Sequence, residues 1–290
     1  MEKAIIIAEV GECFNGDLEI AKKLILVAKK AGCDIAKFQT LDFEGILEND
    51  QEKEWFEKIA FNPEKIKYIA TYARKIDMPI LFSPENKKTA SWLLDIGFKD
   101  VKIPSSLIID MGLIKFINKH FRRVFMSTGM ASLSEIKKAV NNLDNVPELY
   151  ILHCVSEYPT GPLLEKRGLK AMPDDDARLN MMKILMNLFP GHKIGYSDHT
   201  SGIIAPVLAV AAGAKVIEKH ITLDRSMPIK NYKSGKKYLG TDHILSLEPQ
   251  ELREMVKQIR LTERILGTCR WERSKGEVIL RDFMRKRFKG

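Results

Sequence analysis

Cysteine is scarce in this sequence, and its four copies (Cys13, Cys33, Cys154 and Cys269) lie far apart, with no Cys-x-x-Cys pair. Such spacing argues against a disulfide scaffold and against a zinc site built from cysteines. We therefore expect a protein of a reducing compartment. Cys33 and Cys154 fall inside apolar, strand-like segments, so we predict that their thiols are inert core groups.

Long apolar runs are also missing. No run of about 18 apolar residues occurs that could cross a bilayer, and no basic and apolar leader precedes the strand-like segment that follows Met1. Low-complexity tracts are absent, whereas 45% of the residues are hydrophobic and 29% are charged, a composition that suits a large core. We expect a cytoplasmic globular protein with no membrane partner.

Positive charge is in excess, and much of it lies near the C-terminus. The formal net charge is +9, and residues 270–290 contain eight Lys or Arg against three Asp or Glu. A basic segment can bind nucleic acid or a membrane surface, but basic helix ends are commonly just solvated. We therefore expect no nucleic-acid partner and interpret the excess charge as suited to an anionic small-molecule substrate.

Short apolar runs alternate with amphipathic stretches along the chain. The helical pattern is clearest at residues 17–31, 62–76 and 132–143; Asn62 and Pro63 can start the second helix, and Ser132 with Glu135 can cap the third. The runs that predict strands cover residues 4–10, 33–40, 79–84, 98–105, 124–128, 149–156, 193–198 and 216–222.

Strands that are apolar almost throughout and alternate with helices indicate a parallel sheet buried on both faces. Eight such units in 290 residues match a closed (β/α)8 TIM barrel, an α/β fold, better than an open doubly wound sheet. The turn from Gly11 to Gly16 lacks GxGxxG spacing, so a dinucleotide-binding fold has no support. We predict a catalytic barrel over residues 1–267 and a basic C-terminal extension over residues 268–290.

Polar residues gather where the predicted strands end. In barrels of this kind the chemistry takes place at the carboxyl ends of the strands. Random placement would scatter polar residues over both ends, so their concentration indicates a functional site. The residues concerned are Glu9, Lys37, Gln39, Ser83, Lys102, Ser105, Ser127, Thr128, His153, Ser156, Ser197, Asp198, His199, Glu218 and His220.

Lys37 and Lys102 lie inside predicted strands, where an ammonium group is costly to bury unless it meets an anion. An internal salt bridge to Glu9 or Glu218 would satisfy them. Two buried lysines beside several serines favour instead a site for a phosphate and a carboxylate. A Schiff-base role for one lysine also stays open, since burial lowers the pKa of an amine.

His199 and His220 come at the ends of neighbouring predicted strands. A lone histidine is more often a packed core residue, but two on adjacent strand ends predict paired ligands of a divalent cation. With only two imidazoles and with oxygen donors nearby, Mn²⁺, Mg²⁺ or Co²⁺ fits better than a closed structural Zn²⁺ site. We interpret His153 as a core residue or a neighbour of the site. The histidines predicted to lie on the surface are His120, His192 and His243.

Six segments of the chain resemble the sialic acid synthase family, whose members make N-acetylneuraminate, legionaminate and pseudaminate. The segments follow one another in the family's order and spacing, from about residue 4 to about residue 267. They are IIIAEVG (5–11), AKFQT (36–40), FMSTGM (125–130), LHCVSEYPT (152–160), GYSDHT (195–200) and EKHIT (218–222).

The resemblance implies a synthase that condenses phosphoenolpyruvate with a sugar or sugar-like aldehyde, giving a 2-keto-3-deoxy acid and phosphate with the help of a divalent metal. A homodimer is an assembly that fits the family. The resemblance implies phosphoenolpyruvate binding by Lys37, Lys102, Ser105, Ser127, Ser156 and Ser197, metal binding by His199 and His220, proton handling or water orientation by Glu9, and acceptor binding by Tyr158 and Asp242.

Four departures from the family pattern concern the acceptor. Cys13-Phe14 stands where relatives usually have Asn-His, and Leu107 stands where they usually carry an acidic residue. Two loops, residues 161–182 and 227–241, are longer than usual. The resemblance also covers the barrel only, without the family's small C-terminal antifreeze-like domain, which supplies an arginine to the acceptor's N-acetyl group. We expect the chemistry to be kept and the acceptor to differ.

Two other functions stay open. One is a metal-dependent aldolase or lyase of another barrel family, which would need no phosphate site. The other is a barrel subunit or scaffold with weakened catalysis. The presence of all five residues expected to carry the chemistry argues against it: Glu9, Lys37, Lys102, His199 and His220.

Overall fold

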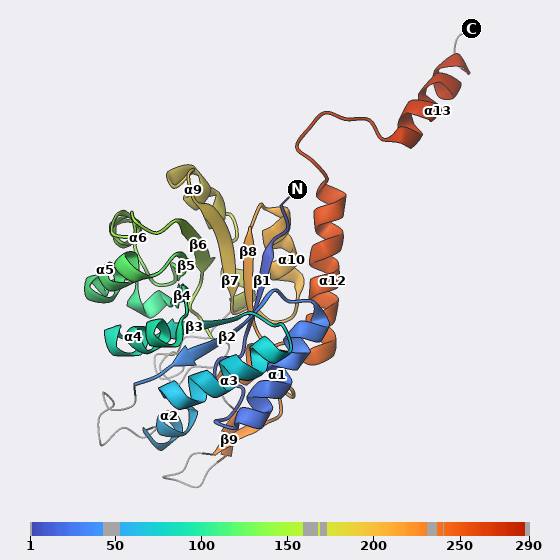
Figure 1. Ribbon diagram of the computed structural model, residues 1–290. Coiled ribbons are helices and arrows are strands. Elements are labelled where there is room, and N and C mark those ends of the chain that lie inside the picture. The colour runs from blue at the N-terminus through green and yellow to red at the C-terminus, as the bar shows by residue number, and fades with distance from the viewer. Residues whose placement is uncertain are drawn as a thin grey trace.

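Eight parallel strands form a nearly closed barrel in the part of the chain that the computed structural model describes, residues 2–42, 53–158, 168, 173–230, 237–239 and 241–287 (Figure 1). Neighbouring strands pair in the order β3-β2-β1-β8-β7-β6-β5-β4, and β3 and β4, at the two ends of this order, contact one another. Each strand overlaps one predicted segment, so the predicted (β/α)8 barrel is confirmed. The bounds are β1 Ile5–Glu9, β2 Ile35–Thr40, β3 Ile80–Pro84, β4 Asp100–Ile103, β5 Arg123–Ser127, β6 Glu148–Cys154, β7 Lys193–Asp198 and β8 Val216–His220.

Helices cover the outside of the barrel (Figure 1). The predicted caps are present, since the Asn62 side chain accepts a hydrogen bond from a first-turn amide, and Ser132 and Glu135 form a capping box. Asp17 caps α1 in the same way. The helices are α1 Leu18–Ala31, α3 Pro63–Lys75, α4 Lys87–Ile96, α5 Met111–His120, α6 Leu133–Asn141, α9 Met181–Leu188, α10 Ile204–Ala211 and α12 Pro249–Leu266.

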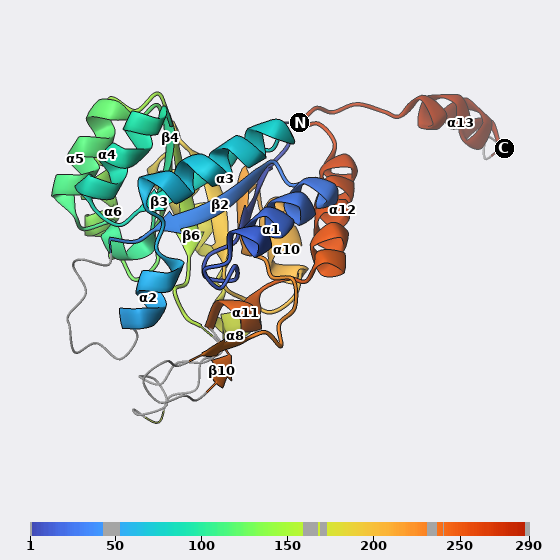
Figure 2. The same ribbon diagram turned by 60° about the horizontal axis from the view of Figure 1, so that its bottom comes forward.

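Smaller elements gather at one end of the barrel (Figure 2). Each follows the carboxyl end of a strand, so this is the end where the predicted site residues lie. The pattern of the sequence did not predict them. Of the two long loops, residues 161–167, 169–172, 231–236 and 240 lie outside the described residues. The elements are α2 Lys53–Ile59, a 3-10 turn Ser105–Leu107, α8 Pro173–Asp176, the hairpin β9 Pro228–Lys230 and β10 Lys237–Leu239, and α11 Thr241–Leu245.

Alternation along the strands divides the barrel into an inner and an outer face. The inner floor is apolar and is filled by Ile7, Ile35, Leu81, Phe125, Tyr150, Leu152 and Val216. Residues of the opposite parity, such as Ile6, Phe38 and Ile217, belong to the larger apolar layer under the helices. The next inward position along most strands is polar, which places a polar layer directly on the apolar floor.

The C-terminal extension contains a helix that the sequence analysis did not predict. α12 ends at Leu266, and α13 (Lys275–Lys286) is exposed along its whole length and stands apart from the barrel (Figures 1 and 2). The division of the chain after residue 267 stays a prediction. Among the described residues, no helix combines the length and apolarity needed to cross a bilayer.

The four cysteines, all of which lie in the described residues, are free. Cys13, Cys33 and Cys154 are buried and Cys269 is exposed. Burial raises the pKa of the Cys33 thiol to about 12, in keeping with the predicted inert core group.

Gly195 of β7 lies where a side chain would meet the backbone of β8, so we predict that Gly195→Ala destabilises the barrel. An added Cβ would lie 2.7 Å from the carbonyl oxygen of Val216 and 2.8 Å from its Cβ. Overpacking of this kind costs about 1–3 kcal/mol, which urea unfolding would measure. The matched control is Gly191→Ala, whose Cβ would meet nothing within 4 Å and should change stability by less than about 0.5 kcal/mol. Equal stability of the two variants would contradict the proposed close contact between β7 and β8.

Candidate active site

A cavity of about 450 Å³ opens above the polar layer of the barrel, a volume that suits a small-molecule ligand. It is lined by the predicted site residues, apart from Asp242, and these come from β1, β2, β4, β5, β7 and β8 and from the loops that follow the strands. The predicted residues that line it are Glu9, Lys37, Lys102, Ser105, Ser127, Ser156, Tyr158, Ser197, His199 and His220.

Two lysines and two glutamates form a buried cluster at the base of this cavity. Lys37 Nζ lies 2.8 Å from Glu9 Oε2 and 3.7 Å from Glu218 Oε2, and Lys102 Nζ lies 2.9 Å from Glu218 Oε1. The salt bridges considered from the sequence are therefore present. They do not exclude an anion site, because the same ammonium groups also face the cavity.

The cluster shifts the pKa values of its members in different directions. Burial raises the pKa of the Glu218 carboxyl, but Lys102 and Lys37 outweigh this effect and hold it well below its usual range. For Lys37, burial lowers the pKa, and the carboxylates of Glu218 and Glu9 reverse the shift and raise it. Burial and the nearby charge of Lys37 lower the pKa of Lys102, although Glu218 opposes them. Lys102 is thus the easier of the two ammonium groups to deprotonate.

Several polar atoms of this layer lack partners. Among the described residues, the buried side-chain atoms without a hydrogen bond are Ser127 Oγ, His220 Nδ1, Glu9 Oε2 and Glu218 Oε2, although the two carboxylate oxygens still face Lys37 across the ion pairs given above. Unpaired buried polar groups are unfavourable and rare in proteins. Their concentration around one cavity indicates a place for a polar ligand.

Gly129 makes room for a group of serine hydroxyls at the β4 and β5 side of the cavity. Its amide donates to Ser105 Oγ at 3.1 Å, and a Cβ built on it would lie 2.7 Å from Ser105 Oγ and 2.1 Å from Ser156 Oγ. The structure thus brings Ser105 and Ser156 together, next to Ser127 at the end of β5. Only glycine at position 129 permits this approach.

His199 and His220 lie side by side at the rim, with ring centroids 5.5 Å apart. His199 Nδ1 donates a hydrogen bond to the carbonyl oxygen of Val155 at 2.9 Å, which leaves Nε2 available as a ligand. Burial lowers the pKa of His199, but Cys154, Val155 and Asp242 outweigh it and raise the pKa to about 9, so a cation bound there would displace a proton.

A cation at this position would have few protein ligands. Among the described residues, no group of three or more His, Cys, Asp or Glu side chains is placed to hold a metal ion. His199 and His220 as the ligands of a cation therefore stay a prediction, in which water or substrate oxygens would fill the remaining positions. Such a set suits Mn²⁺, Mg²⁺ or Co²⁺ better than structural Zn²⁺.

Tyr158 and Asp242, the two predicted acceptor ligands, lie on either side of the histidine pair. The Tyr158 ring is 4.5 Å from that of His199, and burial together with Asp242 raises the pKa of its hydroxyl. Asp242 Oδ2 lies 3.5 Å from His220 Nδ1 and accepts a hydrogen bond from the Glu12 amide. Asp242 therefore contacts His220 rather than the cavity itself. A carboxylate in this position can orient an imidazole that binds a metal ion.

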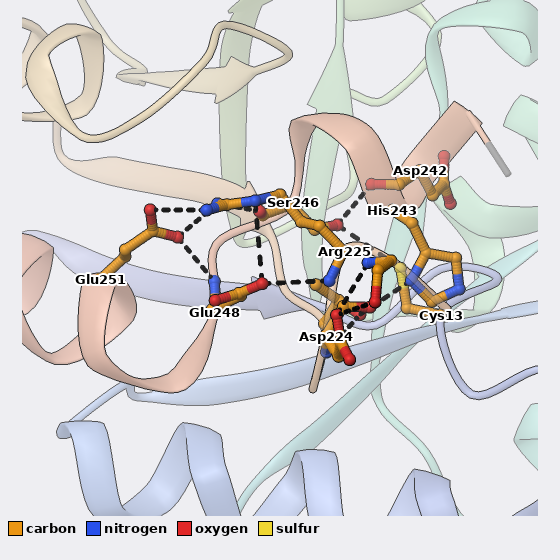
Figure 3. A network of polar contacts seen from close by, with 10 residues as sticks. Cys13, Asp224, Arg225, Asp242, His243, Ser246, Glu248 and Glu251 are labelled. Atoms are coloured by element: carbon orange, nitrogen blue, oxygen red, sulfur yellow. Dashed lines mark hydrogen bonds and ion pairs between the residues drawn. The ribbon is translucent and has the colours of Figure 1, made fainter. Parts of the chain in front are cut away.

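Contacts between α11 and the turn after β1 hold Asp242 in place (Figure 3). The Cys13 thiol lies 3.4 Å from the Ser246 hydroxyl, which in turn donates to the carbonyl oxygen of Asp242. His243 forms hydrogen bonds with Thr222 and Asn15 and is fully buried. The prediction that His243 lies on the surface was wrong, because α11 packs onto the end of β8. His120 is exposed, as predicted, and His192 is half-buried.

Two further expectations from the sequence need correction. Cys13 and Phe14, whose departure from the family pattern was expected to concern the acceptor, do not line the cavity. Both are buried, and Phe14 packs against Phe38 and Phe61. Cys154 is buried but does not belong to the apolar core, because it lines the cavity and its sulfur lies 3.8 Å from His199 Nδ1. Burial raises the pKa of this thiol, whereas His199, Ser105 and Ser156 lower it by more.

The sequence placed Glu218, Ser83 and Gln39 among the polar residues at the strand ends, but predicted no specific role for Ser83 or Gln39 and only a possible ion pair for Glu218. Glu218 Oε1 accepts from both Lys102 and Ser197, Ser83 accepts from Lys37 at 3.2 Å, and Gln39 donates to Glu9 at 2.9 Å. The alternation of side chains along each strand could have shown that these three side chains point into the barrel. Each lies an even number of residues from an inward-facing site residue or floor residue on its own strand.

A second cavity of about 550 Å³ lies beside the first and shares Met130, Cys154 and Ser156 with it. Much of its lining is apolar and comes from α6 and α9 and their approaches, including Leu133, Ile136, Met181 and Ile184. Because the lysine cluster and both rim histidines line the smaller cavity, we place the chemistry there.

Comparison with known proteins agrees with this geometry. The model of the NeuB family matches residues 24–270. A protein of Methanocaldococcus jannaschii without an assigned function is 38% identical over 92% of this chain and 73% of its own length, and the N,N'-diacetyllegionaminic acid synthase of Campylobacter jejuni is 34% identical over 96% and 81%. The crystal structure of an N-acetylneuraminic acid synthetase from Leptospira borgpetersenii, solved with citrate, superposes with a TM-score of 0.82 at 30% identity, covering 99% of this chain and 93% of that one.

We predict that Gly129→Ala weakens the binding of phosphoenolpyruvate, because the new methyl group must displace the hydroxyls of Ser105 and Ser156. Calorimetry should show a loss of about tenfold or more in affinity, equivalent to about 1.4 kcal/mol. Gly191→Ala, which adds the same methyl group in open space, serves as the control and should bind as the parent protein does. Unchanged affinity in Gly129→Ala would remove these serines from the anion site.

Proposed function

The chain belongs to the NeuB family of sialic-acid-type synthases, and on that premise we propose that it condenses phosphoenolpyruvate with a sugar-like aldehyde, using a divalent cation held by His199 and His220. The expected products are a 2-keto-3-deoxy acid and phosphate. Its four free cysteines suit the reducing conditions of a cytoplasm, where we propose that it works.

The observation that carries this proposal is the buried pair of lysines beside unpartnered hydroxyl and imidazole atoms. Lys37 and Lys102 are each almost fully buried and reach the same cavity from β2 and β4. An anion with two separate charged ends, a phosphate and a carboxylate, matches two ammonium groups held on different strands. The chemistry of an aldolase or lyase of another barrel family would not need a phosphate site.

The charge of the cavity supports the need for a cation. Two lysines and two glutamates balance one another, so the cluster offers no net positive charge. A phosphate carries about −1.5 to −2 at neutral pH, and the carboxylate of phosphoenolpyruvate adds one more negative charge. A divalent cation beside His199 and His220 would offset this charge and would polarise the aldehyde as a Lewis acid.

The protein's own groups then have separate tasks in the reaction. Carbon three of phosphoenolpyruvate attacks the aldehyde carbon, the carbonyl electrons move to the aldehyde oxygen, which takes up a proton, and positive charge develops at carbon two of the donor. Water adds to carbon two and gives up its protons as the tetrahedral intermediate collapses to the ketone and the carbon–oxygen bond to phosphate breaks. The ammonium groups of Lys37 and Lys102 compensate the donor's negative charges, and the serine hydroxyls around Gly129 orient it.

Glu9 is the best-placed general base for the attacking water. Its carboxylate is held by Gln39 and Lys37, and it lies opposite His220 in the pairing of β1 and β8. It therefore stands between the donor site and the cation site, where water must add. The fixed geometry keeps this carboxylate in place before substrate arrives.

The acceptor side of the cavity departs from the family through Leu107. Leu107 lies in the 3-10 turn Ser105–Leu107 and lines the cavity with its half-buried side chain. An apolar side chain cannot accept hydrogen bonds from sugar hydroxyls, so the acceptor should present an apolar or smaller group here.

The direct test is a screen of aldoses and related aldehydes with phosphoenolpyruvate and Mn²⁺, in which phosphate release is measured. Release that depends on one class of aldehyde supports the synthase. Tight binding of phosphoenolpyruvate without turnover of any aldehyde would favour the barrel with weakened catalysis. Absence of phosphoenolpyruvate binding would favour the aldolase or lyase.

We predict that His199→Ala and His220→Ala each abolish tight Mn²⁺ binding. Loss of one of two imidazole ligands should lower affinity by more than the roughly 10–100-fold typical of outer-shell substitutions. Electron paramagnetic resonance of free Mn²⁺ measures the affinity without substrate. His120→Ala, on the exposed end of α5, is the control. Parent-like affinity in both site variants would refute the cation site.

We predict that Lys37→Met and Lys102→Met each weaken phosphoenolpyruvate binding by about 2–4 kcal/mol, as expected for loss of a buried charge-assisted contact. Isothermal calorimetry on folded variants gives the affinity. Lys137→Met changes an exposed lysine of α6 and should have no effect. If both buried variants bind as the parent does, the two lysines serve only the internal ion pairs.

We predict that N-acetylmannosamine reacts well below the usual enzyme median of about 10 s⁻¹, because Leu107 leaves a sugar hydroxyl unpaired at a cost of about 1–3 kcal/mol. Leu107→Asp should raise this rate by about tenfold for each 1.4 kcal/mol recovered. Ile109→Asp alters an exposed residue just beyond the same turn and is the control. Fast turnover by the parent protein would show that Leu107 does not restrict the acceptor.

A further inference from the structure

A second polar network lies on the outer face of β7 and β8, beneath the helices. Alternation along β7 turns Gly195 and Ser197 toward the barrel interior, and Tyr196 and Asp198 toward the outside. Tyr196 packs in the outer apolar layer, and α10 contacts both strands. The centre of this network is an ion pair between Asp198 and Lys219, whose side chains are both fully buried.

Both oxygens of the Asp198 carboxylate have hydrogen-bond or ion-pair partners. Oδ2 lies 2.7 Å from Lys219 Nζ and accepts from the Thr200 hydroxyl at 3.1 Å, while Oδ1 accepts from the Tyr196 hydroxyl at 2.8 Å and from the Thr200 amide at 2.9 Å. Lys219 also donates to the carbonyl oxygen of Thr200. The buried atoms without partners, among the described residues, all belong to the inner face of the barrel instead.

The ion pair lies at the level of the candidate cation ligands. Asp198 and Lys219 are direct partners in the pairing of β7 with β8, and His199 and His220 each follow by one residue. Asp198 also bonds the amide and hydroxyl of Thr200, so it holds the backbone on both sides of His199. The ion pair between Asp198 and Lys219 therefore fixes the distance between the backbones of β7 and β8 at the positions where the side chains of His199 and His220 begin.

Stability alone gives little reason to keep this pair. Burying two charges carries a large desolvation penalty, and replacement of a buried ion pair by apolar groups of similar volume is often neutral or stabilising. A charge pair nevertheless has a property that apolar groups lack, because its directional bonds specify one arrangement of the strands.

We propose that Asp198 and Lys219 are positioning residues that set His199 relative to His220 for cation binding. The proposal rests on the function proposed above, because it assumes that the two histidines hold a cation. Under this proposal, a pair of residues that does not line the cavity determines the geometry of the cation site from the outer face of the barrel.

The test is the full-length double variant Asp198→Asn and Lys219→Met, which removes both charges and keeps similar volumes. We expect Mn²⁺ affinity to fall by about 10–100-fold, as for other groups that orient metal ligands, while the thermal midpoint changes little. Affinity is measured by paramagnetic resonance of free Mn²⁺ without substrates, so the readout does not depend on turnover.

The matched control is the double variant Arg260→Met and Glu263→Gln at the opposite end of the barrel. Arg260 lies 3.0 Å from Glu263, which accepts from the Ala4 amide just before β1. This variant also removes an ion pair that holds a strand, so it reproduces any general loosening. It should leave Mn²⁺ affinity unchanged.

Parent-like Mn²⁺ affinity in the Asp198/Lys219 variant, or an equal loss in the control, would overturn the proposal and leave the proposed function standing. Failure of the parent protein to bind Mn²⁺ would instead remove the cation site and this inference with it. If the double variant does not fold, Thr200→Val replaces it, since this change deletes one hydroxyl bond to Asp198 and keeps both charges. Unchanged Mn²⁺ affinity in folded Thr200→Val would then count against the positioning role.

Discussion

Mutual neutralisation of four buried charges is the constraint on which the centre of this barrel depends. Neither Lys37 nor Lys102 could be buried alone, and Glu9 and Glu218 compensate them at distances of 2.8 to 3.7 Å. The balance lets the chain fold without ligand. An anionic donor of the proposed kind would have to compete with Glu218 for the lysines, so the proposed donor and cation would be best accommodated together.

Much of the fold could be predicted because its signals are local. Apolar runs of strand length, helix caps such as Asp17 and Ser132, and the alternation of side chains each act over a few residues. The gathering of site residues at one end followed from the parallel direction of the strands. The histidine pair followed from the adjacency of β7 and β8. These inferences needed no knowledge of how distant segments pack.

The remaining features depend on contacts between segments far apart in the chain. His243 is buried because α11 folds back onto β8 and onto Asn15, more than 200 residues earlier. Phe14 belongs to the aromatic cluster with Phe38 and Phe61, which no local pattern reveals. The inward orientation of Cys154 follows from strand parity, but its closeness to His199 depends on how β6 and β7 are staggered.

The tripeptide Glu218-Lys219-His220 makes three different contacts from consecutive residues of β8. Glu218 pairs with both lysines of the cavity, Lys219 binds Asp198 on the outside, and His220 faces the proposed cation site. Because its side chains alternate between the two faces, a single inserted or deleted residue within β8 would exchange them, turning the ammonium group of Lys219 inward and the imidazole outward. A change in the length of β8 would therefore disturb all three contacts at once, whereas a substitution at one of these positions would disturb one of them.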